Sequence, residues 1–345
     1  MAEKLAITFK PKQVVKRLLA VLGDRSQDVL TSRFGLGEDT KRMTLEAIGK
    51  KYKITRERVR QIENYSIINV RKSKEYSKEK EVFDELKEII ANLGSTVGED
   101  SLLKHLSKDK SIQNQIHFLL VVGEDFVREK EDDEFKHRWT VDKELSKKIH
   151  GSLRQLYSSL TDDEILLESD MIEKFLEHVK DVSEKYKNQE IAKRWLSLSK
   201  LIDKNPLGEW GKSKSSNINA KGMRDFAYLV IRRHGSPIHF REVAKLITEL
   251  FNKKAHVATT HNELIKDPRF VLVGRGLYAL SEWGYMSGVV REVIKSIIEK
   301  HGPMTKDEVI KRVLKERYVK ENTIMVNLQN PKFFKKSKEG KYSIV

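Results

Sequence analysis

The sequence has no cysteine among its 345 residues, which excludes disulfide frameworks and thiolate metal sites and allows an intracellular setting. It has only six prolines, and no apolar run approaches the length of a transmembrane helix. Residues 1–12 do not contain the apolar segment that is typical of a secretory signal. We therefore expect a cytoplasmic protein without a membrane partner.

Motifs of common catalytic chemistry are also missing. The sequence contains no glycine-rich phosphate loop, no nucleophile elbow and no HExxH. His256 and His261 have no cysteine or carboxylate cluster near them that would complete a metal site. The acidic runs at 131–134 and 162–164 lie beside turn or helix-start signals, where capping and solvation explain them. We expect no enzyme, no metal and no cofactor.

Charge of one sign dominates parts of the chain. The net charge is +16 with a pI near 9.6, which favours nucleic acid as a partner. Residues 1–75 carry 18 Lys and Arg against 9 Asp and Glu, and residues 285–345 carry 14 against 7. Residues 143–205 carry 12 against 12 and are neutral. The basic charge is therefore concentrated toward both ends of the chain.

The most informative segment is Met43–Gln61, with the sequence MTLEAIGKKYKITRERVRQ. Thr44 and Thr55 each precede an apolar-periodic run, where a hydroxyl can cap a new helix. A short link, Lys53-Ile54, separates the two runs. The apolar positions at helical spacing are Leu45, Ile48 and Tyr52 in the first run and Val59 and Ile62 in the second. This pattern predicts a helix-turn-helix.

The second helix should present a polar face to solvent. If Val59 and Ile62 point to the core, one contiguous outer face remains, with Arg58 at its flank. Its members are Arg56, Glu57, Arg60 and Gln61. In a major groove, Arg can bind guanine acceptors, Glu can accept from cytosine N4, and Gln can pair with adenine. We expect this face to bind double-stranded DNA.

Roughly residues 9–74 resemble region 4 of the bacterial sigma-70 family of transcription initiation factors. The resemblance rests on the runs RFGLG (33–37), TLEAIG (44–49) and TRERVRQIE (55–63). It implies that the second helix reads a minus-35 promoter element and that the preceding helices dock on the flap of RNA polymerase. The residues that it places on DNA are Arg56, Glu57, Arg60 and Gln61 on bases or in the groove, and Thr44, Leu45 and Glu46 against phosphates.

The same resemblance gives the helices around Val14–Phe34 as the polymerase contact. We expect apolar surface there from Val14, Leu18, Val21 and Leu22. Two departures from the family limit the comparison. Residues 65–70 are largely uncharged where the family is basic and Leu-rich, and nothing resembles the aromatic, basic helix that opens promoters in complete sigma factors. We expect that the chain does not open promoters alone.

Beyond residue 75, one pattern recurs three times. Glycines at 94, 235 and 302 each follow an amphipathic helix and precede a second one. Two apolar segments then follow, beginning near residues 126, 270 and 333. Helices followed by a short hairpin at this spacing predict three winged-helix units, here called the first, second and third repeats. Of these, residues 221–283 resemble the HARE-HTH winged-helix family, which includes the folded domain of the RNA polymerase delta subunit; the runs that match are GSPIHFREV (235–243), PRF (268–270) and GRGLYAL (274–280).

The predicted fold is mainly α with small β-hairpin wings: a helix-turn-helix head followed by three winged-helix units and a helical spacer. The expected domains are the head at 1–75, the first repeat at 76–142, a helical spacer and linker at 143–215, the second repeat at 216–284 and the third at 285–345. We expect the spacer to pack against the first repeat, and a linker at 205–208 and 211–216. Candidate wing contacts to DNA are Arg275, Lys335, Lys336 and Lys338.

Our leading hypothesis is a sigma-factor-like transcription regulator that binds promoter-type DNA and contacts RNA polymerase core. One alternative is a delta-like accessory subunit of polymerase that acts mainly by protein contacts. Another is a DNA-recognition subunit of a restriction or defence system, which rests on the HARE-HTH resemblance alone.

Overall fold

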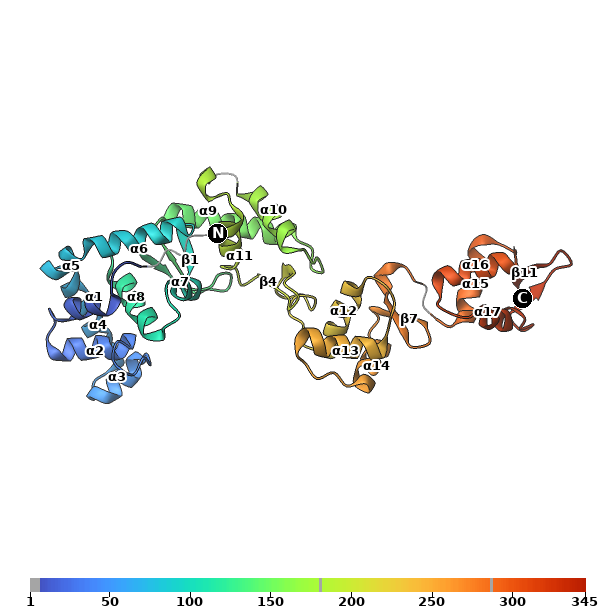
Figure 1. Cartoon of the computed structure of the whole chain (residues 1–345), viewed down its shortest axis with the longest axis horizontal. Coiled ribbons are helices and arrows are strands. Elements are labelled where there is room, and N and C mark those ends of the chain that lie inside the picture. The colour runs from blue at the N-terminus through green and yellow to red at the C-terminus, as the bar shows by residue number, and fades with distance from the viewer. Residues whose placement is uncertain (1–6, 180–181, 286–287) are drawn as a thin grey trace. The chain divides into compact units, whose positions relative to one another are not determined.

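The computed structural model describes residues 7–179, 182–285 and 288–345, which are mainly helical with small antiparallel sheets (Figure 1). The chain divides into two compact units. Unit 1 comprises Met1–Lys204 and Gly208–Ser213, and unit 2 comprises Asn205–Leu207 and Lys214–Val345. None of the helices in the described ranges combines the length and apolar character needed to span a bilayer.

Unit 1 contains the head, the first repeat and a further helical segment. The head consists of α1 (Pro11–Leu19), α2 (Asp24–Phe34), α3 (Leu45–Tyr52) and α4 (Arg56–Arg71), and α5 (Lys74–Lys78) leads out of it. The first repeat consists of α6 (Lys80–Asn92), β1 (Thr96–Gly98), α7 (Glu99–Leu106), α8 (Lys110–Val122), β2 (Val127–Glu129) and β3 (Arg138–Thr140). The helical segment consists of α9 (Lys143–Ser159), α10 (Glu168–His178), the 3-10 helix Glu184–Tyr186, α11 (Gln189–Leu196), β4 (Ile202–Lys204) and β5 (Trp210–Lys212).

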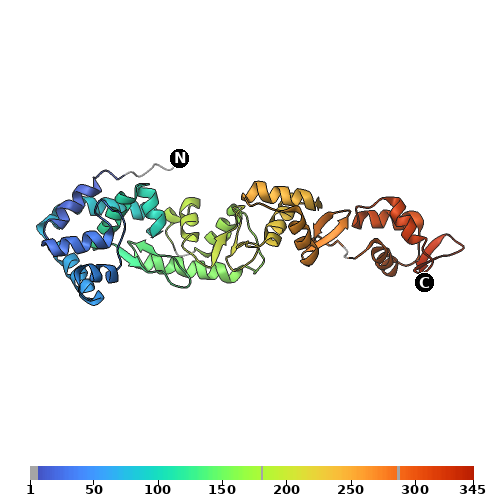
Figure 2. The ribbon, with the colours of Figure 1, turned by 90° about the horizontal axis from the view of Figure 1, so that it is seen from below.

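The head and the first repeat share one hydrophobic core. Helices α1, α2 and α4 lie against α8, as the ribbon shows from two sides (Figures 1 and 2). A single buried cluster includes Leu18 and Leu30 of the head together with Leu86 and Ile116 of the first repeat. Each fully buried side chain of this kind contributes roughly 1.5–3 kcal/mol. The expected boundary between residues 75 and 76 therefore runs between two segments that bury the same core.

A buried asparagine joins the head to α8. Asn114 is fully buried, and its Nδ2 donates to the carbonyl oxygens of Gly35 (3.0 Å) and Thr40 (2.7 Å). Its Oδ1 accepts from Nε of Arg42 at 2.8 Å. Gly35 ends α2 with φ +63°, and a Cβ at this position would lie 2.5 Å from the Thr40 oxygen. The loop from α2 to α3 is thus held from three points by one side chain.

The first repeat has a three-stranded antiparallel sheet in the order β1-β3-β2. Behind it, Glu99 accepts hydrogen bonds from Nε of Arg128 (2.7 Å) and from Nε1 of Trp139 (2.9 Å). Burial alone would raise the pKa of Glu99, but the neighbouring His117 and Arg128 hold that pKa well below its usual range. The buried carboxylate therefore stays charged and ties α7 to the sheet.

The helical segment packs against the first repeat, as the sequence predicted. Nε1 of Trp195 donates to the Gly94 oxygen at 3.0 Å, and the hydroxyls of Ser95 and Tyr186 lie 2.9 Å apart. The hairpin loop of the first repeat is also covered, because Phe135 is 2% exposed and pairs with Ser199. This wing therefore lies against its own chain.

The expected linker is wrong in its central part. Residues Trp210–Lys212 form β5, which pairs with β4 in an antiparallel hairpin. Trp210 is 2% exposed, and its backbone exchanges hydrogen bonds of 2.8 and 2.9 Å with Leu166. The glycines at 208 and 211 resembled a flexible tether, but Gly208 belongs to the turn of this hairpin and Gly211 to its second strand.

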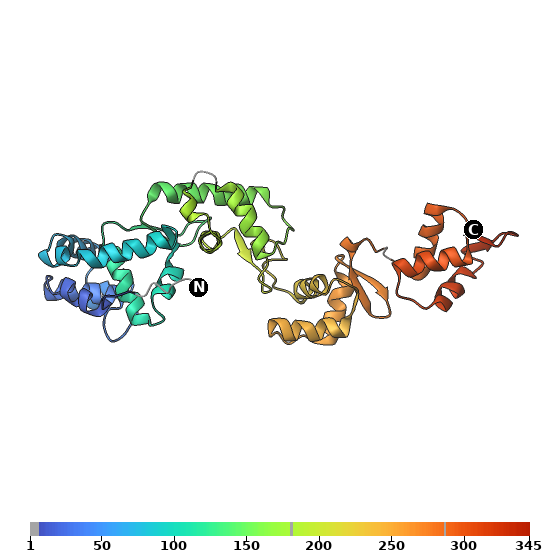
Figure 3. The same ribbon diagram turned by 45° about the horizontal axis from the view of Figure 1, so that its top comes forward.

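Unit 2 contains the second and third repeats. The second consists of α12 (Met223–His234), β6 (Ile238–His239), α13 (Phe240–Phe251), α14 (Val257–Lys266), β7 (Phe270–Gly274), β8 (Leu277–Leu280) and the 3-10 helix Ser281–Trp283 (Figure 3). The third consists of α15 (Val290–His301), β9 (Met304–Thr305), α16 (Lys306–Glu316), α17 (Glu321–Leu328), β10 (Phe334–Lys336) and β11 (Lys341–Ile344). The strand orders are β6-β8-β7 and β10-β11-β9.

The order helix, short strand, two helices and hairpin thus occurs three times in the described residues. The sequence pattern predicted two helices and a hairpin in each copy, and the short strand and the further helix come from the structure. In each case the short strand pairs with the last strand of the hairpin: β1 with β3, β6 with β8, and β9 with β11. The equivalent helices before the hairpins are α8, α14 and α17. These three helices differ in burial: α8 is largely buried, whereas α14 and α17 each have an exposed side.

The correction at Trp210 gives the first prediction. Trp210→Ala should destabilise unit 1 by about 3–5 kcal/mol, because it removes a large buried side chain and leaves a cavity. Leu167→Ala is the control, since Leu167 lies beside the hairpin but is 59% exposed, and its loss should cost less than about 0.5 kcal/mol. Chemical unfolding followed by tryptophan fluorescence and circular dichroism measures both. Equal, small effects would restore the linker interpretation.

Candidate nucleic-acid interface

Two capped helices form the candidate interface. The Thr44 hydroxyl accepts a hydrogen bond from the amide of Ala47 at 3.1 Å and starts α3. The Thr55 hydroxyl accepts from the amide of Arg58 at 3.1 Å and starts α4. Both threonines were predicted as caps from their positions before apolar runs, and both predictions are confirmed.

The turn between the helices is tight. Lys53 ends α3 in the left-handed region with φ +56°, and the amide of Ile54 donates to the Gly49 oxygen at 3.0 Å. A Cβ on Gly49 would lie 2.7 Å from the Ile54 oxygen. Gly49 therefore permits the close approach that sets the angle between α3 and α4.

A small core supports the turn from beneath. Val29 of α2, Ile48 of α3 and Val59 of α4 are fully buried and in contact. Ile62, Leu45 and Tyr52 pack partly buried around them. The inward positions expected from helical spacing are therefore the observed ones.

The outer face of α4 is open to solvent. All five predicted side chains on it are exposed: Arg56, Glu57, Arg58, Arg60 and Gln61. Two local pairs order them. The guanidinium of Arg60 donates to both carboxylate oxygens of Glu57, at 2.9 and 2.6 Å, and Arg58 donates to Oε1 of Gln61 at 3.1 Å.

The ion pair between Glu57 and Arg60 also favours the charged forms of both side chains. The hydrogen bond from Arg60 holds the pKa of Glu57 below its ordinary value, and Glu57 in turn raises the pKa of Arg60. Glu57 is thus an acceptor at neutral pH, beside the three guanidinium groups of Arg56, Arg58 and Arg60. Such a row of alternating acceptor and donors matches the edges of base pairs in a major groove.

At the start of α3, fewer side-chain groups are available to contact phosphates than the sequence suggested. The Thr44 hydroxyl already serves as a cap, Leu45 is partly buried, and Glu46 forms an ion pair with Lys50 at 2.9 Å. Lys50 lowers the pKa of Glu46 through this hydrogen bond. The backbone amides at the start of α3 remain the groups that suit a phosphate best.

Two exposed residues beside this face were not among the predicted site residues. Arg25 of α2 and Tyr65 of α4 line an open hollow of about 500 Å³ together with Arg58 and Gln61. Tyr65 is 65% exposed and continues the outer face by one turn, so helical spacing could have found it. Arg25 is 33 positions before Arg58, and no periodicity within α4 indicates it.

The apolar surface expected for polymerase contact is mostly absent. Val14 (1% exposed), Leu18 (0%) and Leu22 (9%) are buried in the core shared with the first repeat. Only Val21, at 36%, is exposed. The prediction was wrong for the three buried residues, because the amphipathic face of α1 is covered by α8 of the same chain.

The candidate wing residues are exposed in unit 2. Arg275 lies in the turn between β7 and β8, and Lys335 and Lys336 are on β10. Lys338 follows in the turn of that hairpin. The neighbouring aromatics Phe334 and Tyr342 are buried. Within the described ranges, no group of three His, Asp or Glu side chains is placed to hold a metal ion.

One segment of the chain, which contains the candidate interface, is similar to known proteins. Residues 18–72 match the family model described as Sigma-70, region 4. The chain is 43% identical over 60 residues to the RNA polymerase sigma factor SigA of Lactococcus lactis subsp. cremoris, covering 17% of this chain and 16% of that protein. It is 45% identical over 60 residues to RpoD of Helicobacter pylori (strain ATCC 700392 / 26695), covering 17% and 9%. A third match, to SigA of Clostridium acetobutylicum, is 38% identical over 83 residues, covering 24% and 21%.

The chain thus spans less than a quarter of the length of these relatives. The matched residues contain α2, α3 and α4 entirely, and with them the whole exposed face described above.

The turn geometry gives a prediction. Gly49→Ala should destabilise the head by about 1–3 kcal/mol, because its Cβ meets backbone that cannot move without shifting α4. The control is Gly151→Ala in the middle of α9, where nothing lies within 4 Å and helix propensity should make the change stabilising by up to about 1 kcal/mol. Thermal unfolding of both variants measures the difference. Effects of the same sign and size would contradict the close approach at Gly49.

Proposed function

We propose that the protein is a sigma-factor-like transcription regulator that recognises promoter-type, minus-35-like DNA through α4 and contacts bacterial RNA polymerase. The observation that carries the proposal is the exposed row Arg56–Gln61. It begins at a threonine cap, stands on a well-packed core, and lies wholly within the segment that matches sigma-70 region 4. We place this activity in the cytoplasm, and opening of promoter DNA is not part of the proposed role.

Each side chain of the row has a distinct proposed task. Arg56 and Arg60 would bind guanine O6 and N7, Glu57 would accept from cytosine N4, and Gln61 would pair with adenine. Arg60 would exchange its contact with Glu57 for a base contact on binding. Arg58 at the flank would bind phosphate, together with Arg25, which lines the same hollow.

Thr44, Leu45 and Glu46 would then lie close to the DNA backbone at the start of α3. Because the Thr44 hydroxyl caps the helix, the contact there would come from backbone amides and the positive end of the helix dipole. The exposed ion pair of Glu46 with Lys50 would bring a lysine close to the same phosphates. Contacts of this kind position the helix and carry no sequence information.

We further propose that the three repeats are winged-helix units and that the second belongs with the HARE-HTH type. The recurring order of elements, with the short strand paired to the last strand of the hairpin, supports the first proposal. The sequence pattern over residues 221–283 supports the second.

Polymerase contact in this proposal cannot use the buried face of α1. The available surface is the exposed side of α1, with the cations Lys12 and Lys16, and the turn after α1, with the exposed apolar residue Val21.

A second candidate function is an accessory subunit of polymerase that acts mainly through protein contacts. One observation favours it: the second repeat exposes Leu250 (39%), Val257 (42%) and Ile265 (62%) on and around α13 and α14. Exposed apolar side chains on helices suit a protein partner better than DNA. Co-purification with polymerase that survives nuclease treatment and is unaffected by variants of α4 would favour this candidate.

The sharpest test concerns Glu57. Binding of the full chain to a minus-35-type duplex and to a scrambled duplex of equal length is measured by fluorescence anisotropy over a range of salt. The native chain should prefer the first at least tenfold, about 1.4 kcal/mol. Glu57→Ala should abolish much of this preference while leaving binding to the scrambled duplex nearly unchanged.

The matched control is Glu88→Ala. Glu88 is an exposed glutamate on α6, so its replacement changes the net charge of unit 1 by the same amount without touching α4. It should keep the preference intact. If Glu57→Ala changes the affinity for both duplexes by the same factor, as a change of charge alone does, direct readout by Glu57 is excluded.

A further inference from the structure

The helix that precedes the hairpin has a different surrounding in each repeat. In the first repeat, α8 is covered by the head, and its residues from Gln113 to Leu120 are buried without interruption. Its hairpin loop is covered too, by residues 198–200 of the helical segment. In the first repeat, α8 and Phe135 of the hairpin loop are therefore used for contacts within the chain, while residues 130–133 of the loop stay exposed, and we assign this repeat a scaffold role.

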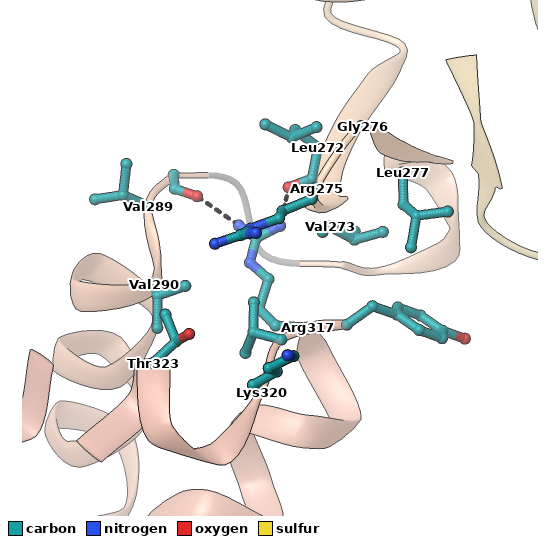
Figure 4. Close-up of a pocket in the computed structure, with 14 residues that line it drawn as sticks. Leu272, Val273, Arg275, Gly276, Leu277, Val289, Val290, Arg317, Lys320 and Thr323 are labelled. Carbon is teal, nitrogen blue, oxygen red and sulfur yellow. Dashed lines mark hydrogen bonds between the residues drawn. The ribbon is translucent and has the colours of Figure 1, made fainter. Parts of the chain in front are cut away.

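In the second repeat, the wing is attached to the third repeat. The amide of Tyr318 donates to the Val273 oxygen at 2.8 Å, and Gly274 pairs with Tyr318. The Arg317 side chain is 2% exposed and donates to the oxygens of Leu272 and Gly288 (Figure 4). A hollow of about 560 Å³ lies at this junction, with Arg275 on its wall.

The third repeat leaves its hairpin and one side of α17 exposed, while Thr323 on the first turn of α17 lines the hollow at the second repeat. On α17, Ile324 and Leu328 are buried, and Asn322, Thr323 and Val326 are exposed, Val326 by 62%. The β10–β11 hairpin projects from the helices of its repeat (Figures 1 and 3). Phe334 and Tyr342 anchor it to the core, so its polar side chains face solvent.

This hairpin is strongly basic. Residues 329–341 contain five lysines and one glutamate, and all five lysines are exposed. They are Lys332, Lys335, Lys336, Lys338 and Lys341. Within the part of the chain that the structure describes, none of them forms an ion pair with a carboxylate. On the head, by contrast, Arg60 is already paired with Glu57.

We propose that the third repeat is a second double-stranded DNA site, separate from α4. The hairpin lysines bind backbone phosphates, and α17 lies in the adjacent groove with Asn322 and Val326 against base edges. A helix of this size fits a major groove, an asparagine can pair with adenine, and the methyl groups of valine can contact the methyl group of thymine. The inference goes beyond the proposed function, because it requires neither promoter recognition by α4 nor polymerase.

The test uses the full chain. Lys335→Gln, Lys336→Gln and Lys338→Gln are combined in one variant. The control combines Lys295→Gln, Lys300→Gln and Lys311→Gln, which removes three exposed lysines from α15 and α16 of the same repeat. Both variants lose the same charge, and both should keep the native melting temperature, since all six side chains are exposed.

Binding to a 30-base-pair duplex of random sequence is measured by fluorescence anisotropy between low and physiological salt. For the hairpin variant we expect at least tenfold weaker binding and a salt slope reduced by about 2–3, one unit for each lost phosphate contact. The control should change affinity less than about threefold, as expected for charges that act only through the general field. Equal losses in the two variants would overturn the proposal.

Two further variants separate this site from the head and test the helix. With Arg56→Gln and Arg60→Gln in place, the hairpin variant should still lower affinity on random DNA; loss of that effect would mean that the third repeat acts only through the head. Asn322→Ala should alter preference among duplexes selected for tight binding without changing the salt slope. Binding identical to the native chain on every duplex would exclude α17 from the groove. Reduced polymerase binding with unchanged DNA binding would identify the hairpin as a protein contact instead.

Discussion

The arrangement of unit 1 depends on the shared core of the head and the first repeat, with Asn114 at its polar edge. Asn114 is buried on α8, and it satisfies two carbonyl oxygens of the α2–α3 loop while accepting from Arg42. Because buried backbone oxygens without partners are costly, a single amide side chain fixes the path of the loop that leads into the helix-turn-helix. The helix-turn-helix is therefore tied to the first repeat through the loop that precedes α3.

This arrangement assigns different roles to similar parts. The helix that could read DNA in the first repeat, α8, is the one on which the head is built. The wing of the second repeat is joined to the third through Arg317 and Tyr318. The third repeat retains an exposed helix and a basic hairpin. The same order of elements thus has a structural role in the first repeat and leaves an exposed surface in the third. Several weak binding sites on one chain can together give stable binding, because each bound site raises the effective concentration of the others.

Structural features that depend on residues close together in the sequence were predicted correctly. The caps at Thr44 and Thr55 and the inward positions of Ile48 and Val59 follow from hydroxyl chemistry and helical spacing, and the structure confirms them. The exposure of Arg56–Gln61 follows from the same spacing. The errors occurred where a pattern has two solutions. The apolar periodicity of α1 predicts that one face of this helix is buried. It does not predict whether that face is buried against a polymerase or against α8 of the same chain. Glycines near Trp210 suit a tether or a hairpin turn equally well.

The sequence by itself determined the helix-turn-helix, its outward row of charged side chains, the threefold recurrence of helices and hairpin, and the basic ends of the chain. These features depend on residues within a few turns of one another, where backbone geometry limits the choices. Only the tertiary structure decided which apolar faces are already covered, that residues 210–212 pair with residues 202–204 as a hairpin, that Arg25 lies beside Arg58, and that the third repeat keeps one side of α17 and its basic hairpin exposed. Each of these depends on contacts between residues distant in the chain, and burial by a distant partner leaves no signal in the local pattern.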